Sequence, residues 1–163
     1  MKYYELYPEV AGTINEDCII DVTARPIKIT GMHYEFDGWL GDDFLTKGGH
    51  FIITKKLGEV IRKTKLTGYE LLDCKVSKSD KFEEMYPNKA LPVFKWLNIT
   101  GEFPKDDFWF SKNTMMLNVS EGVLTVIKQF QISNCDIEPT DKKKISSDDD
   151  SNNRWLPPNW NKN

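Results

Sequence analysis

The feature of this sequence that most constrains its fold is a pattern that occurs twice. The tripeptide Asp-Asp-Phe stands at residues 42–44 and again at 106–108. Each copy is followed by an apolar segment, a Thr or Ser suited to an N-cap, and apolar residues at helical spacing. Inside the two predicted helices, residues 60–62 (Val-Ile-Arg) match residues 126–128 (Val-Ile-Lys). The pattern predicts an internal duplication of a hairpin-helix-strand unit of about 65 residues, although chance resemblance between common α+β elements is the alternative.

The other segments complete a predicted α+β fold. Helices are expected at 54–66, 79–86 and 120–130, with Phe82, Met85 and Tyr86 facing inward from the second. The glycines and acids of 35–49 predict a loop. Strands are expected at 2–7, 18–22, 27–34, 51–53, 69–76, 91–99, 108–110, 115–119 and 135–137. Together these segments predict a mixed, mainly antiparallel sheet with two or three helices.

Length and composition indicate one domain and a tail. A chain of 163 residues with 39% hydrophobic residues can bury one substantial core, which we place in residues 1–140. From Asp141 the sequence DKKKISSDDDSNN is polar and predicts a linker. The end of the chain contains Trp155, two prolines and Trp160. We expect this segment to dock on its own domain or on another chain.

Charge and cysteine content exclude several function classes. The net charge is −3 and only three residues are arginine, which disfavours nucleic-acid recognition. No apolar run approaches the ~18 residues of a membrane span, and no signal-peptide pattern opens the chain, so we expect a cytoplasmic protein without a membrane partner. Cys18, Cys74 and Cys135 are odd in number and scattered, which favours buried free thiols.

The sequence contains none of the common catalytic motifs. His33 and His50 are the only histidines, and neither has metal-ligand spacing to a cysteine or a second histidine. A glycine-rich phosphate loop, a GxSxG elbow and an HExxH helix are all missing from the sequence. We therefore expect a protein that is not an enzyme and that needs no cofactor and no metal.

The paired acids and the tryptophans beside them are the candidate site residues. As a structural device, the acids cap turns while a phenylalanine anchors each loop. As a recognition device, they form an acidic surface with aromatic anchors for a partner protein. The candidate partner-binding residues are Trp39, Asp42, Asp43, Asp106, Asp107 and Trp109.

Two alternatives to partner binding stay open. A metal-dependent hydrolase would need the four aspartates of the two Asp-Asp-Phe loops to converge near His50. A carbohydrate-binding module would need Trp39, Trp96 and Trp109 to be exposed.

Two stretches of the chain resemble a known family. They are 51–79 (FIITKKLGEVIRKTKLTGYELLDCKVSKS) and 91–137, with LPVFKWLNITG, DDFWF, LNVSEGVLTVIKQF and NCDI. They are similar to bacterial immunity proteins of polymorphic toxin systems, in particular immunity family eleven, formerly a domain of unknown function, and family forty-three. The resemblance spans about half of the chain. It implies a small cytoplasmic toxin inhibitor that neutralises a cognate toxin domain by protein-protein interaction, and it identifies no toxin-binding residue. A homodimer formed through a sheet edge is a further open alternative.

Overall fold

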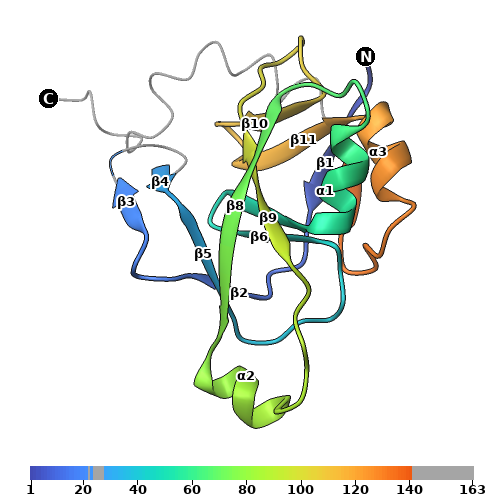
Figure 1. Cartoon of the computed structure of the whole chain (residues 1–163). Coiled ribbons are helices and arrows are strands. Elements are labelled where there is room, and N and C mark those ends of the chain that lie inside the picture. The colour runs from blue at the N-terminus through green and yellow to red at the C-terminus, as the bar shows by residue number, and fades with distance from the viewer. Residues whose placement is uncertain (22, 24–27, 141–163) are drawn as a thin grey trace, which may run out of the picture.

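The computed structural model describes residues 1–21, 23 and 28–140, which form an α+β fold made mainly of sheet (Figure 1). The predicted linker and tail at 141–163 lie outside the described residues. The helices are α1 (Lys55–Arg62), α2 (Asp80–Met85) and α3 (Glu121–Ile127). The strands are β1 (Tyr3–Tyr7), β2 (Gly12–Ile14), β3 (Ile19–Asp21), β4 (Lys28–Thr30), β5 (Met32–Phe36), β6 (Phe44–Lys47), β7 (His50–Thr54), β8 (Tyr69–Lys78), β9 (Phe94–Ile99), β10 (Phe108–Ser111), β11 (Met116–Ser120) and β12 (Asp136–Pro139).

The strands form two larger sheets and one separate hairpin. The six-stranded sheet has the order β2-β5-β8-β9-β7-β6, the four-stranded sheet has the order β10-β11-β1-β12, and β3 pairs with β4. Strands β5 and β8 run parallel, and the other pairs of named strands are antiparallel. The predicted mixed, mainly antiparallel sheet with three helices is therefore confirmed.

The two halves of the chain have the same order of elements and equivalent strand registers. Hairpin β6–β7, helix α1 and strand β8 correspond to hairpin β10–β11, helix α3 and strand β12. In the first hairpin Phe44 pairs with Ile53, and in the second Phe108 pairs with Val119. This agreement is what the repeated Asp-Asp-Phe pattern predicts.

The second half takes its fourth strand from the N-terminus of the chain. In the first half β9 lies between β7 and β8, and in the second half β1 lies between β11 and β12. Leu97 of β9 pairs with Leu71, and Leu6 of β1 pairs with Ile137 in the same register. The second unit is therefore complete only when the first residues of the chain join it.

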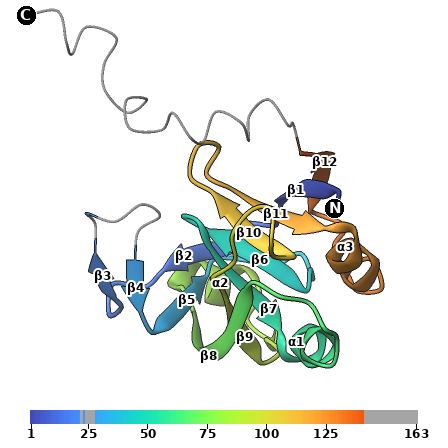
Figure 2. The same ribbon diagram turned by 90° about the horizontal axis from the view of Figure 1, so that it is seen from above.

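Both units contribute matching residues to one core. Helices α1 and α3 lie side by side (Figures 1 and 2). Residues at equivalent positions of the two units pack together in this cluster: Phe44 and Phe108, Ile53 and Val119, Leu57 and Val123, and Ile61 and Ile127. Ile52 points to the opposite face of β7, where a second cluster contains Tyr34, Phe94 and Phe82 of α2. Strand β7 is thus covered by apolar residues on both faces.

Two details differ from the expectations. Residues Phe44–Lys47 form strand β6 inside the predicted loop 35–49, because Gly48 and Gly49, both with positive φ, close a two-residue hairpin turn. In α2 only Phe82 is buried, whereas Met85 and Tyr86 are exposed. The Tyr86 ring packs against that of Phe82, with 5.6 Å between centroids, but the rest of its surface faces solvent.

Candidate partner-binding surface

The first Asp-Asp-Phe loop is buried and its carboxylates are hydrogen-bonded. Asp43 Oδ1 accepts a bond from Thr54 Oγ1 at 2.8 Å, and Oδ2 accepts one from Gln131 N at 2.8 Å. Asp42 accepts bonds from both the backbone N (2.8 Å) and the side-chain Nδ2 (3.0 Å) of Asn134. The loop therefore connects the start of α1 to the segment that follows α3.

The second loop makes the reciprocal connection. Asp107 Oδ1 accepts a bond from Ser120 Oγ at 2.7 Å, and Oδ2 accepts one from Thr67 N at 2.9 Å. Asp106 Oδ2 accepts a bond from Glu102 N at 2.9 Å and closes its own turn. Because each loop links the start of one helix to the segment after the other, the loops lie at opposite ends of α1.

These positions correct part of the predicted site. Asp42, Asp43 and Trp109 are buried, with 0%, 2% and 2% of their surface exposed, so a docking partner does not reach them directly. Asp42 and Asp43 act structurally, since they accept bonds from the Thr54 hydroxyl and from the backbone N–H groups of Gln131 and Asn134. Trp39, Asp106 and Asp107 keep part of their surface exposed but belong to different ends of the molecule.

The geometry also bears on the two alternative functions. Within the described residues, no group of three or more His, Cys, Asp or Glu side chains is placed to hold a metal ion, so the four aspartates do not converge there. Trp96 and Trp109 are both buried, which removes two of the three aromatic rings that a carbohydrate platform would need.

Trp39 lies beside a groove at the start of α1. Its Nε1 donates to Asp42 O at 2.9 Å, and its ring packs edge-on against Phe94 with 5.9 Å between centroids. The groove has a volume of about 670 Å³. Its apolar wall consists of Trp39, Leu91, Pro92 and Val93, and its charged rim consists of Lys55, Lys56 and Glu59.

Exposed apolar side chains gather around this groove. Leu40 follows Trp39 and is 69% exposed, and Val93 in the groove wall is 61% exposed. Lys89 Nζ lies over the rings of both Trp39 (5.5 Å) and Tyr86 (5.1 Å), which holds the two aromatic residues near each other. We call Trp39, Leu40, Tyr86, Leu91 and Val93, with the lysines of the rim, the Trp39 surface.

A buried acid supports the loop of the Trp39 surface from below. Both oxygens of Glu9 accept from Leu40 N, at 2.9 and 3.4 Å. Burial raises the pKa of Glu9, although the bond from the Leu40 N–H acts in the opposite direction. The backbone of Leu40 is therefore fixed while its side chain remains exposed.

Only part of this surface was predictable from the sequence. The position of Trp39 beside the acids predicts it as a site residue, whereas the sequence places Leu91 and Val93 in a predicted strand at 91–99. Strand β9 begins only at Phe94, so these residues lie in an exposed connection. Pro87 and Pro92, which both disfavour regular strand pairing, were the available signal.

In comparisons with known proteins, no family model matches the chain, and no curated protein matches it at a significant level. Among the described residues, no helix combines the length and the apolar character needed to cross a membrane.

Proposed function

We propose that this chain is a protein-binding module and that the Trp39 surface contacts its partner. The observation that supports this most directly is the gathering of Leu40, Tyr86 and Val93, all exposed, around an apolar groove. Clustered exposed apolar residues with a charged rim are typical of interaction sites. Trp39 and Tyr86 are also of the residue types that most often dominate binding energy.

The partner in this proposal is the toxin domain of a polymorphic toxin system, which the chain neutralises in the cytoplasm. The similarity of residues 51–79 and 91–137 to immunity proteins supports this choice. A standard interface of about 1,600 Å² centred on the groove would be large enough to occlude a toxin active site.

A co-expression assay tests both parts of the proposal. The toxin domain encoded beside the gene is expressed with wild-type protein or with a Leu40→Asp/Val93→Asp variant, and growth is measured. We expect the wild type to restore growth and the variant to fail to do so, since each Asp places a charge in an apolar contact and should weaken binding by at least about 100-fold. Leu72→Asp, at an exposed apolar residue of β8 outside the Trp39 surface, is the matched control.

The outcomes test the immunity function and the place of the toxin interface separately. Protection by the wild type and by Leu72→Asp, but not by the double variant, supports both parts. Protection by all three moves the interface away from the Trp39 surface. Neither binding nor protection by folded wild type rejects the immunity function.

A further inference from the structure

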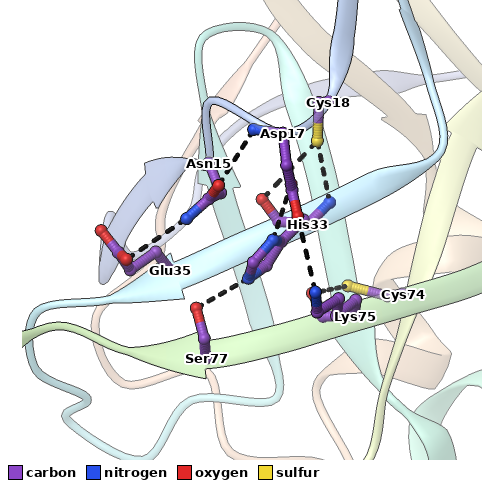
Figure 3. A network of polar contacts seen from close by, with 8 residues as sticks. All are labelled: Asn15, Asp17, Cys18, His33, Glu35, Cys74, Lys75 and Ser77. Atoms are coloured by element: carbon purple, nitrogen blue, oxygen red, sulfur yellow. Dashed lines mark hydrogen bonds and ion pairs between the residues drawn. The ribbon is translucent and has the colours of Figure 1, made fainter.

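Three side chains from separate segments form a hydrogen-bonded line on one face of the six-stranded sheet (Figure 3). Ser77 Oγ lies 2.7 Å from His33 Nε2, and His33 Nδ1 lies 2.7 Å from Asp17 Oδ1. Ser77 belongs to β8, His33 to β5, and Asp17 to the turn between β2 and β3. The order of the atoms is that of a hydroxyl nucleophile, an imidazole base and a carboxylate that orients it.

The sheet fixes two members of this line. Strands β5 and β8 run parallel, with His33 beside Lys75 and Glu35 beside Ser77, so all four residues share one face. Tyr34 and Phe36, which alternate with them on β5, point into the core behind the sheet. His33 and Ser77 therefore cannot exchange faces without a shift of the strand register.

The turn that holds Asp17 is also fixed. Asn15 Oδ1 accepts from Asp17 N at 3.0 Å, and Cys18 Sγ accepts from His33 N at 3.1 Å. Lys75 Nζ lies 3.5 Å from Asp17 Oδ2. The His33 side chain is only 9% exposed, whereas that of Asp17 is 52% exposed, so the imidazole is held between a solvent-facing acid and the sheet.

We propose that Ser77, His33 and Asp17 form an acyl-transfer site that reacts with small, uncharged, activated esters. Ser77 is the nucleophile and His33 the general base, while Asp17 is a positioning residue that holds His33 Nδ1–H. The exposure of Asp17 and Lys75 places the site on an open face, which a small ester can approach from solvent. This inference is independent of the proposed partner binding.

The reaction needs no group beyond the ester and water. Ser77 Oγ bonds to the ester carbonyl carbon while its proton passes to His33 Nε2. The bond to the alcohol oxygen then breaks, and His33 returns the proton to the leaving alkoxide, which gives acyl-Ser77 and the free alcohol. Water, deprotonated by His33, hydrolyses acyl-Ser77 and releases the acid.

Neighbouring charges set the electrostatics of the site. The hydrogen bond from His33, together with Lys75, lowers the pKa of Asp17, so Asp17 is ionised at neutral pH. Lys75 lies two residues before Ser77 on the same face, where its ammonium group favours a developing oxyanion. Glu35, beside Ser77, bonds to Asn15 Nδ2 at 3.3 Å, and its charge disfavours anionic substrates.

Labelling of the purified full chain with a fluorophosphonate probe tests the site, with peptide mapping to locate the adduct. We expect the label on Ser77, no label in Ser77→Ala, and a labelling rate at least about 100-fold lower in His33→Gln. Asp17→Asn should also slow the labelling. Ser133→Ala, at another side-chain hydroxyl of the chain, should label like the wild type.

Folding is checked in each variant by its melting temperature. Absence of label on Ser77 in folded wild type overturns the proposal. Equal labelling of wild type and a folded His33→Gln variant also overturns it, because a hydroxyl that His33 does not activate is an ordinary serine. Release of p-nitrophenol from p-nitrophenyl acetate, lost in folded Ser77→Ala, supports turnover.

Discussion

Asp43 and Asp107 show one chemical device used at two equivalent positions. Each carboxylate accepts one bond from the hydroxyl at the start of its own helix and one from a backbone N–H of the other unit. The two residues differ in environment, since Asp43 is buried and Asp107 is partly exposed. Charge-assisted bonds of this kind are stronger when water is excluded, so the same device should stabilise the two loops unequally.

Replacing each aspartate by alanine measures this difference. Asp43→Ala leaves the buried Thr54 Oγ1 and the part-buried Gln131 N without their acceptor, and we expect a loss of about 2–4 kcal/mol in the free energy of unfolding. Asp107→Ala should cost about 1–2 kcal/mol because water replaces part of the lost contact. Urea unfolding of both variants checks the prediction, and equal losses would contradict it.

The raised pKa values of two cysteine thiols and one tyrosine hydroxyl predict a loss of stability at alkaline pH. Burial raises the pKa of Cys74 and Tyr34 to about 12 and that of Cys135 to about 11. In the unfolded chain thiols ionise at pH ~8.5 and tyrosines at pH ~10, so the unfolded state loses protons first. The stability is therefore complete below pH ~8.5 and falls as the pH rises toward the folded pKa values.

The urea midpoint between pH 7 and pH 10.5 checks this sign. We expect it to decrease steadily above pH ~8.5, and less steeply in a Cys74→Ala/Cys135→Ala variant. A midpoint that stays constant over this range would show that burial does not perturb these groups.

At the scale of elements, the two hairpins differ in the turns that close them. Hairpin β6–β7 turns through Gly48 and Gly49, with φ of 58° and 79°. Hairpin β10–β11 is closed by the longer turn 112–115, in which Met115 has a φ of 56°. Positive φ costs little for glycine, whereas a side chain of the L configuration is strained there.

Placing a side chain at Gly49 and removing the side chain of Met115 should shift the free energy of unfolding in opposite directions. Gly49→Ala should lower the free energy of unfolding by about 1 kcal/mol, and Met115→Gly should raise it by up to about 1 kcal/mol. Thermal unfolding of both variants measures the effects. A loss of stability in Met115→Gly would mean that side-chain contacts of Met115 outweigh its backbone strain.

At the scale of the whole molecule, the duplicated units cannot be separated by cutting the chain between them. The second unit requires β1 from the N-terminus, and both units share the core around Phe44, Phe108, Ile61 and Ile127. The reciprocal bonds of Asp43 and Asp107 join them a second time. Folding should therefore be cooperative over the described residues.

A fragment of residues 1–105 tests this cooperativity. It keeps the whole six-stranded sheet but loses α3 and the second hairpin, so the apolar faces of α1 and β1 are left uncovered. We expect neither a cooperative thermal transition nor dispersed amide signals in NMR. A cooperative transition in the fragment would show that the first unit folds alone.

The sequence by itself determined the local features of this protein. Helical spacing, the Ser120 N-cap and the repeated Asp-Asp-Phe pattern predicted three helices and two matching units, because these signals lie within a few turns of chain. Strand β6 was missed because its glycine-rich surroundings are equally typical of a loop.

Only the tertiary structure decided which residues meet. Asp43 bonds to Gln131, β1 completes the second unit, and Asp17, His33 and Ser77 come together from three segments. The same long-range packing buries Asp42 and leaves Val93 exposed, against the polarity of both residues. Polarity and periodicity act along the chain, whereas burial depends on the partners that distant segments bring, and no local pattern encodes those partners.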